Sequence, residues 1–388
     1  MSVFANSAQT QLSYVPEVTF GTTPGGPSML KFRFTSADLD LDKTILKSDE
    51  RRTDGQVPFL RHGNRRVKGT VKGQLSYLAY KDLIRAWLRY PTSGSGHGVS
   101  TAGVNTSFVS GSKTIHRTSG SWVTDGFVAN QKIRVTGAAQ AGNNTVLTIA
   151  SLTASDITVV EAVTTESATN NTKINGDYAE NQTTDKSFSV EAGFTDIVQY
   201  QVLKGLKVDK MNVSAKPNSM VDLTFDLVGQ DSAAFSGSSL GAPTDVDTSD
   251  PCDTTTGSVQ EGGAASAIIS GADFSGAWNR QLTEVLGAAI PQTIEAGMFD
   301  VSGTITAFFA DATLFNKFIS ETLTSLLIAF TDPANNAIYF YFPAVKYTGG
   351  SKSISGSSDV PLKLPFTAYR DATTGKTCIV NMVPGVAV

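Results

Sequence analysis

Hydrophobic and polar residues alternate along several stretches of the chain, and this period of two predicts β-strands. The clearest stretches are residues 30–42, 67–77, 220–229 and 360–369. In the first of them, Leu39 and Leu41 share one face, while Asp38, Asp40 and Asp42 share the other. Such strands cover a core with one face and leave the other face polar.

The period changes after the second of these strands. Between residues 80 and 90, Ile84, Trp87 and Leu88 are spaced as i, i+3 and i+4, which predicts the apolar stripe of a short amphipathic helix. Pro91 and the Gly- and Ser-rich residues after it end this helix.

The same strand-then-helix pattern occurs twice, in residues 67–88 and 298–319. A shift of 230 residues aligns Val71 with Val301, Gly73 with Gly303, Leu75 with Ile305, Ile84 with Leu314 and Leu88 with Phe318. Two later alternating strands, residues 221–227 and 360–366, match at the smaller shift of 139. We interpret the chain as two copies of one unit, the first of which is interrupted by an insertion.

The segment that accounts for the smaller shift is residues 92–175, which are rich in Thr, Ser, Asn, Ala and Gly. It contains four strand-like runs, at residues 113–116, 131–135, 145–149 and 156–160. Turn residues separate these runs at roughly regular spacing, which predicts a small β-sandwich or barrel. We expect its core to be formed by Trp122, Phe127, Ile133, Val135, Leu147 and Ile149.

These patterns predict a mainly β fold with two tandem β-sandwich modules, each carrying a short α-helix, and an inserted small β-sandwich domain. The first module is discontinuous and comprises residues 1–91 and 176–231. Residues 92–175 are the inserted domain, residues 232–265 are a linker rich in Ser, Gly, Asp and Thr, and residues 266–388 are the second module.

Composition and charge narrow the possible functions. Charged residues are only 17% of the 388, against about 25% in typical soluble proteins. Two interpretations stay open: a turn-rich β protein, or a surface that is largely hidden in an assembly. A net charge of −4 argues against a simple nucleic-acid binder. The two cysteines, Cys252 and Cys378, are too few for a disulfide framework.

No segment predicts a membrane insertion or a secretory signal. The first residues lack a basic region followed by an apolar one. The most apolar short run, residues 326–330, is far below the roughly 20 residues of a membrane span. We therefore expect a protein that is made for the cytoplasm of its producer.

Residues 43–66 show no clear period and predict a long loop. The wider segment 43–72 holds nine Lys or Arg against three Asp or Glu, a net charge of +6 in a chain of −4. It could bind nucleic acid, lie free in solvent, or dock as an arm on an acidic neighbouring copy. The opposed charges favour the third interpretation. The residues assigned to this arm are Lys47, Glu50, Arg51, Arg52, Phe59, Arg61, Arg65 and Arg66.

No catalytic, cofactor-binding or metal site is expected, and the chain is not predicted to be an enzyme. The three histidines, His62, His97 and His116, occur in unrelated contexts without zinc-ligand spacing. Residues 94–98 are glycine-rich but have no acid or base partner nearby.

Two short motifs lack a position that their chemistry requires. The Asp38-x-Asp40-x-Asp42 spacing resembles the start of an EF-hand loop, but Lys43 occupies the position that needs glycine. Gly375-Lys376-Thr377 resembles the end of a P-loop, but Arg370 stands where the first glycine should be. We interpret the aspartates as strand alternation and the second motif as a turn between two terminal strands.

The opening segment, AQTQLSYVPEVTFGTTP at residues 8–24, resembles the start of tail tube proteins, also called major tail proteins, of long-tailed bacteriophages. The later order is also similar to this family: a strand, the Ser48–Arg52 arm, the strand around Gly73 and Leu75, and a short helix. The Thr-rich insert resembles the extra outer domain of several members. The type indicated is the one with a duplicated tube domain, from phages with non-contractile tails.

This resemblance implies a structural virion protein. Such subunits form stacked rings, their inner strands join into one continuous barrel, and a long loop reaches a neighbouring subunit or ring. Members with two tube domains form homotrimeric rings that imitate sixfold symmetry. The channel carries DNA into the host, so Asp38, Asp40 and Asp42 are expected to face the lumen and keep the polyanion moving.

The partners implied are further copies of the chain, a tail terminator, and baseplate or distal tail proteins. The tape measure protein, and later phage DNA without sequence-specific binding, would occupy the lumen. The expected location is the phage tail, with the host cytoplasm during assembly, and no cofactor is implied. Two alternatives remain: a phage or surface adhesin that binds carbohydrate, and a β-rich hydrolase.

Overall fold

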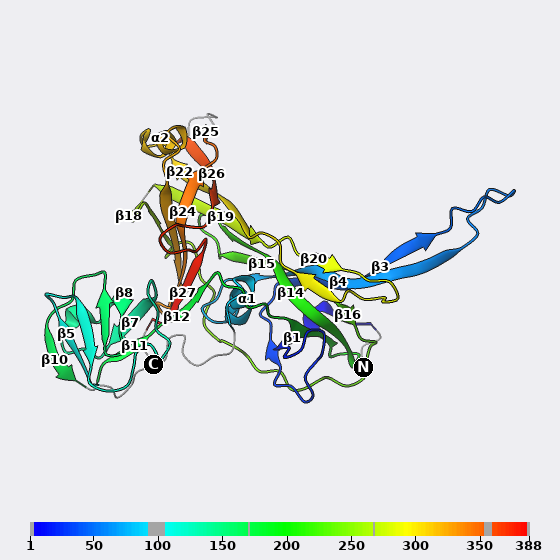
Figure 1. Ribbon diagram of the computed structural model, residues 1–388, viewed down its shortest axis with the longest axis horizontal. Helices are drawn as coiled ribbons and strands as arrows, with labels where there is room; N and C mark the ends of the chain where they lie inside the picture. The colour runs from blue at the N-terminus through cyan, green and yellow to red at the C-terminus, as the bar shows by residue number, and fades with distance from the viewer. Residues whose placement is uncertain (1–3, 92–104, 170, 267, 353–358, 386–388) are drawn as a thin grey trace.

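The computed structural model describes residues 4–91, 105–169, 171–266, 268–352 and 359–385. The protein is mainly β, with 48% of residues in strands and 6% in helices, and this confirms the predicted fold class. A long hairpin of β3 (Ser36–Lys47) and β4 (Leu60–Gln74) projects from one end, and the inserted domain lies at the other (Figure 1).

The order of elements in the first half of the chain is repeated in the second half. The first half contains η1 (Ser7–Gln9), β1 (Thr10–Pro16), β2 (Leu30–Lys31), β3, β4, α1 (Lys81–Trp87), β13 (Phe188–Phe194), β14 (Gln199–Ala215), β15 (Asp222–Gly229) and β16 (Asp231–Ser232). The second half contains β17 (Ser258–Glu261), β18 (Ala264–Ala265), β19 (Ile269–Ala277), β20 (Gln281–Thr283), β21 (Thr293–Glu295), β22 (Asp300–Phe308), α2 (Thr313–Ile319), β23 (Thr324–Thr331), β24 (Ala337–Tyr347), β25 (Ser351–Lys352), β26 (Pro361–Ala368) and β27 (Ile379–Val383).

The strand pairings are repeated as well. In the first half β3, β4, β15 and β14 pair in that order, and in the second half β19, β22, β26 and β24 do the same. β14 also pairs with β19, so the two sets join into one antiparallel series of eight strands. A row of directly opposed residues crosses the whole series: Ala37, Val71, Phe225, Met211, Gly276, Val301, Ala368 and Val345.

The predicted alternation explains which face of this series is covered. Val71, Phe225, Val301 and Leu364 are at most 1% exposed and belong to one hydrophobic core that extends through both halves. The predicted helix is confirmed as α1, and its Ile84 and Trp87 are fully buried in the same core.

The inserted domain has its own seven-stranded sheet and its own core. Its elements are β5 (Thr106–Val109), β6 (Thr114–Arg117), β7 (Lys132–Thr136), η2 (Ala141–Asn143), β8 (Val146–Leu152), β9 (Asp156–Val159), β10 (Glu166–Thr169) and β11 (Lys173–Asn175). All six residues predicted for the core are buried. The chain leaves the insert through β12 (Asp177–Glu180).

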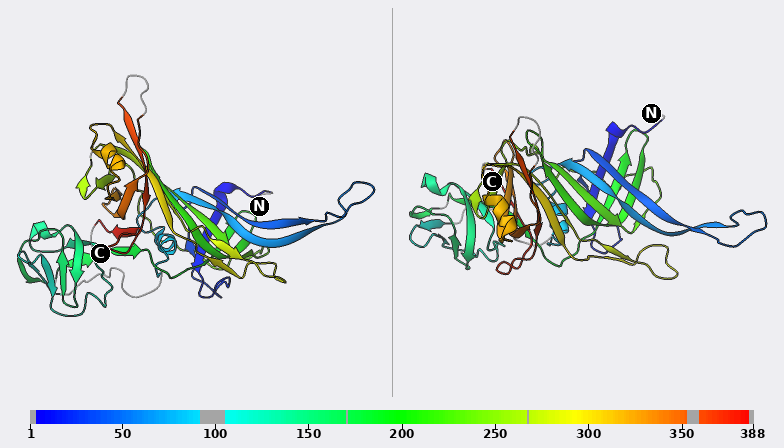
Figure 2. Two further views of the ribbon diagram at one scale, coloured as in Figure 1. Left: turned by 45° about the horizontal axis from the view of Figure 1, so that its top comes forward. Right: turned by 90° about the horizontal axis from the view of Figure 1, so that it is seen from above.

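Although the insert interrupts the first half, it contacts the second half. The backbone N–H of Lys132 donates to Asn381 Oδ1 at 2.8 Å, and Arg134 Nε donates to the carbonyl of Pro384 at 3.1 Å. β12 pairs with β27 of the second half. The insert is therefore attached through β27, whose residues belong to the buried core on the covered side of the series. Figure 2 shows it at the end of the molecule away from the arm.

The structure corrects three expectations. Residues 43–66 do not form one long loop, because β3 continues to Lys47 and β4 begins at Leu60. Both faces of this hairpin are exposed, so no apolar period marks its strands. The expected linker, residues 232–265, contains β17 and β18 near its end.

The third correction concerns the internal alignment. Phe225 lies opposite Val71, and Ala368 lies opposite Val301, so the last strands match at a shift of 143 and not 139. A slip of an even number of residues leaves every side chain on the same face, and hydrophobic alternation cannot detect it.

Candidate assembly surfaces

The seam between the two halves is sealed by aromatic side chains from both. Trp87 Nε1, at the end of α1, donates to the carbonyl of Gly276 at 2.8 Å, and Trp278 Nε1 donates to the carbonyl of Trp87 at 2.6 Å. The ring of Phe299 lies 5.3 Å from that of Trp87 and 4.6 Å from that of Trp278. α1 thus closes the gap beside the β14–β19 pairing.

The carboxylate of Asp185 also links the two halves at this seam, because it lies between three basic side chains. Asp185 lies 2.7 Å from Arg280 Nη2 and 2.6 Å from Lys207 Nζ, with Arg89 Nε at 3.6 Å. Burial raises the pKa of Asp185, but the hydrogen bonds and charges of Arg280 and Lys207 outweigh it and hold the pKa below its ordinary value. The ionised form is therefore favoured in the folded chain.

Asp185→Asn is expected to lower the free energy of unfolding of the unassembled chain by about 3–5 kcal/mol, because it leaves buried basic groups without a counter-charge. Since the folded pKa is lowered, the stabilisation by Asp185 is present above about pH 4 and is lost as the pH falls through the folded value. Denaturant titrations between pH 3 and 7 measure both effects. The control is Asp245→Asn, which removes an exposed pair with Lys31 and should cost about 1 kcal/mol or less. Equal costs for the two variants would contradict the assignment.

The eight-strand series ends in two edges that can accept a further strand. Among the described residues, no strand pairs with β3 on the side away from β4. The same holds for Lys346 and Tyr347 of β24 on the side away from β26. A hollow of about 400 Å³ adjoins the β24 edge and is lined by Phe318, Ile319, Glu321, Lys346, Tyr347 and Thr348.

The helix beside the β24 edge lacks the covering that α1 has. Ile319 ends α2 as Trp87 ends α1, and both helices are followed by a residue with positive φ, Arg89 at 55° and Glu321 at 50°. Trp87 is fully buried at the internal seam, whereas Ile319 is 64% exposed. The second half thus presents the helix side of a seam whose other side is missing in the single chain.

The face of the series away from the core is polar. One row across all eight strands is Ser36, Lys72, Thr224, Asn212, Ser275, Ser302, Thr367 and Lys346. Asp38, Asp40 and Asp42 lie exposed on this same face, as the strand interpretation predicts. Asp40 lies opposite Lys68, and Asp42 lies 3.4 Å from Arg66 Nη2. The face therefore carries charged residues of both signs.

The structure divides the residues assigned to the arm into two groups. Lys47, Glu50, Arg51, Arg52, Phe59 and Arg61 are exposed on the projecting hairpin (Figure 1). Arg65 and Arg66 lie at its base in contacts within the chain: Arg65 Nε is 2.8 Å from Asp231, and Arg66 pairs with Asp42. Phe59 is accompanied by further exposed apolar residues, Ile45, Leu46, Val57 and Leu60.

The second half carries a shorter counterpart of the arm, which folds back on the first half. It lies between β19 and β22 and contains the β20–β21 hairpin. The carbonyl of Ala289 accepts a hydrogen bond from the backbone N–H of Arg65 at 2.8 Å, and that of Pro291 accepts one from Gln230 Nε2 at 2.8 Å. The shorter arm thus contacts the base of the projecting hairpin and the end of β15 within the same chain.

The described residues show no arrangement with catalytic character. No group of three or more His, Cys, Asp and Glu side chains in that part of the chain is placed to hold a metal ion. His116 pairs with Asp156 at 2.8 Å on the insert, His62 lies on the arm, and His97 and residues 94–98 fall outside the described ranges. Gly375–Thr377 belong to the turn between β26 and β27, as predicted. No described helix is long and apolar enough to cross a membrane.

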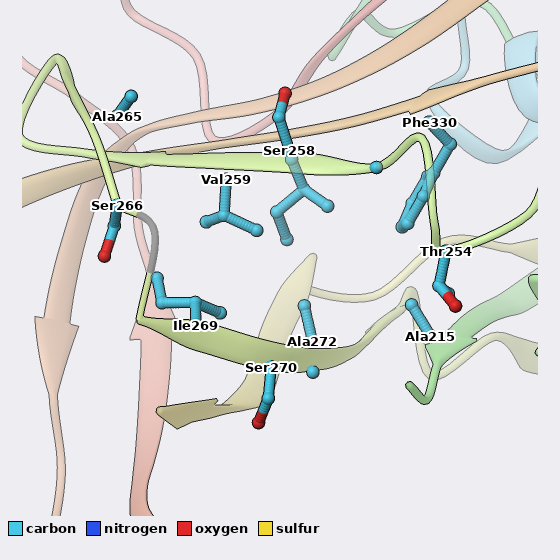
Figure 3. Close-up of a pocket in the computed structure, with 13 residues that line it drawn as sticks. Ala215, Thr254, Ser258, Val259, Ala265, Ser266, Ile269, Ser270, Ala272 and Phe330 are labelled. Carbon is cyan, nitrogen blue, oxygen red and sulfur yellow. The ribbon is translucent and has the colours of Figure 1, made fainter. Parts of the chain in front are cut away.

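A hollow with mainly apolar walls lies between the β17–β18 segment and β19 (Figure 3). Its volume is about 360 Å³, and Val259, Ile269, Ile328 and Phe330 contribute to its lining. The lining contains no titratable side chain, so the hollow can bury apolar groups but offers no acid or base for catalysis.

Sequence reasoning missed the residues of the seam. Trp278, Phe299 and Asp185 come from segments without a clear period, and only their pairing in space shows what they do. The one available signal was the spacing of Trp87 on the predicted helix.

A comparison with protein-family models matches residues 7–368 to a family described as phage tail tube protein. No curated protein matches the sequence.

Proposed function

The chain belongs to the phage tail tube protein family, and from this premise we propose that three copies close into a ring and that rings stack into the channel for DNA. Membership supports a structural role, self-assembly into a tube and a place in the virion tail. Trimeric rings, the division into two tube modules with a linker and an insert, and the passage of DNA are the finer parts of this proposal.

The observation that carries the proposal is the internal seam, where β14 pairs with β19. Met211 of β14 lies opposite Gly276 of β19 there. In the repeated pairings of the two halves, Val345 of β24 occupies the position that Met211 has in β14, and Ala37 of β3 occupies the position that Gly276 has in β19. The edge of β24 is free at Lys346 and Tyr347, whereas Val345 pairs with Thr324 of β23 within the chain. We expect β3 of a second copy to join this edge in the same register, which requires it to replace Thr324 opposite Val345. Ile319 and the adjoining hollow would then be covered by the neighbour, as Trp87 is covered within the chain.

The strand count supports a channel of suitable width. Each chain contributes eight strands, so three chains give about 24 in a closed wall. With strands about 4.8 Å apart and tilted by about 40°, the backbone diameter is roughly 45–50 Å, and a DNA duplex passes after side chains line the bore. The open polar face lines this bore, and its acidic residues, Asp38, Asp40 and Asp42 among them, lie near basic ones and so weaken any hold on phosphate.

The remaining surfaces have their own proposed roles. The insert projects outward, because it is attached on the covered side of the series. The projecting arm contacts an adjacent copy. Terminator, baseplate and tape measure proteins would meet the ends and the lumen of the tube, with assembly in the host cytoplasm.

A disulfide test measures the proposed register directly. Ser36 and Lys346 lie on the open face and are opposed in the proposed closure, so Ser36→Cys with Lys346→Cys should link neighbouring chains upon oxidation. The native cysteines are fully buried, and burial raises the pKa of Cys252 to about 12, so they do not compete. Non-reducing gels should show linked trimers.

The matched control moves one cysteine along the same strand. Asp40→Cys with Lys346→Cys places the thiols about 13 Å apart in the proposed register and should give no link. Links in the control and none in the first variant would overturn the proposed ring closure.

A further inference from the structure

The apolar hollow of Figure 3 lies at the end of the eight-strand series opposite the arm. The part of β4 that pairs with β15 runs from Val67, opposite Gly229, to Gln74, opposite Asp222. The arm extends from the Val67 end of this part. β14 ends at Ala215, one residue beyond the Ser214–Asp222 pair, and Ala215 lines the hollow. In rings stacked head to tail, the arm of one ring is thus directed toward this end of the next.

The lining of this hollow is suited to binding apolar side chains. Figure 3 shows Val259 from β17 and Ile269 and Ala272 from β19 facing one another across it, with Phe330 at one side. At about 360 Å³ it is large enough for one or two side chains. Filling it with apolar groups would remove both surfaces from water.

The arm presents side chains that suit such a hollow. Val57 and Phe59, on either side of Pro58, are 62% and 64% exposed. The preceding turn is ordered: Gly55 N–H donates to the carbonyl of Arg52 at 3.1 Å, and Gln56 N–H donates to Asp54 Oδ1 at 3.2 Å. Phe59 is also held by the hydrogen bond that its carbonyl accepts from Ser48 N–H at 3.0 Å. The apolar segment beside the tip is therefore positioned before it meets a partner, which lowers the entropic cost of docking.

The charges at the two ends of the molecule are opposite. Residues 43–61 of the projecting hairpin hold five basic and three acidic residues, whereas residues 245–265 hold five acidic residues and no Lys or Arg. The acidic segment crosses the end that carries the hollow: Cys252 N–H donates to the carbonyl of Leu75 at 2.7 Å, and Asp253 bridges to Met220. The basic arm and the acidic segment beside the hollow attract each other, which favours one direction of stacking.

We propose that the hollow between β17–β18 and β19 receives Val57–Phe59 of the arm of a second copy in the adjacent ring. This inference rests on the proposed function, because it requires stacked rings. It assigns the contact between rings to one hollow and to one three-residue segment.

Cross-linking tests the contact. Val57→Cys with Val259→Cys should give disulfide-linked chains in oxidised tubes, because Val259 faces the hollow. Val57→Cys with Val123→Cys is the control, since Val123 is exposed on the insert and should give no link. Tubes that form from the first variant without a link would overturn the proposed contact and leave the tube intact. If the unmodified chain forms no rings or tubes at all, the proposed function itself is contradicted.

A second variant keeps the test independent of disulfide geometry. Phe59→Ser removes an exposed side chain and should not affect the fold of the single chain, yet it should raise the protein concentration needed for tube growth by about tenfold or more. Val123→Ser is the matched control and should leave that concentration unchanged. Equal thresholds for Phe59→Ser and the unmodified chain would contradict the proposal.

Discussion

Arg51→Glu combined with Arg52→Glu is expected to abolish tube growth while single chains and rings still form. The change lowers the net charge of the arm segment from +6 to about +2 and places acidic groups at its tip, toward the acidic end of the next ring. Both residues are exposed. The substitution removes the surface ion pair of Arg52 with Asp54 at 3.3 Å, and the loss of such a pair has little effect on the stability of the single chain.

Sedimentation and electron microscopy of the purified variant measure this effect. The conservative pair Arg51→Lys with Arg52→Lys keeps the charge and should still form tubes, with at most a modest increase in the required concentration. If the glutamate variant grows tubes of normal length at normal concentration, the arm does not carry the contact between rings.

Ala37→Pro is expected to block ring closure and leave the single chain folded. Trp278 N–H donates to the carbonyl of Asp209 across the internal seam at 2.9 Å. By strand alternation, Gly276 also directs its N–H to β14, and its counterpart Ala37 directs its N–H to the free edge of β3. Proline there removes a donor that the chain itself does not use, and edge strands tolerate such a proline.

Circular dichroism and size-exclusion chromatography should show a folded monomer with an unchanged melting temperature and no rings. Ala37→Ser keeps the N–H and serves as the control, which should assemble normally. Normal rings from the proline variant would mean that β3 does not pair with a second chain.

The free edge of β3 raises the question of what prevents unwanted pairing before assembly. Unpaired edges invite aggregation, and charged residues along an edge discourage it. Asp38, Asp40 and Asp42 supply such charges on this strand.

The sequence predicted the parts of the fold in which one face of an element is buried. The strands around Val71, Phe225 and Leu364 and the six core residues of the insert were identified, because burial imposes a period on their side chains. The order of elements in the two halves followed from the same signal.

The remaining features depend on contacts between distant segments, which leave no period. The strands of the arm have two exposed faces, and the register of β26 was off by four residues because both alignments bury the same side chains. The Asp185 cluster combines side chains from four segments, with Arg89 and Arg280 each more than 90 residues from Asp185. The net charge of the arm follows directly from its sequence, whereas its hairpin structure could not be predicted from the sequence pattern.

The central claim is a tube whose rings contain three chains, each supplying two modules to the wall. Electron microscopy of the assembled protein with rotational averaging of end-on views measures this most directly. The account predicts hollow rings with three outer knobs from the insert and six inner modules around a bore wide enough for a DNA duplex. Six equal knobs would assign one chain to each sixth of the ring and contradict the trimer, and solid or open-ended sheets would contradict the closed channel.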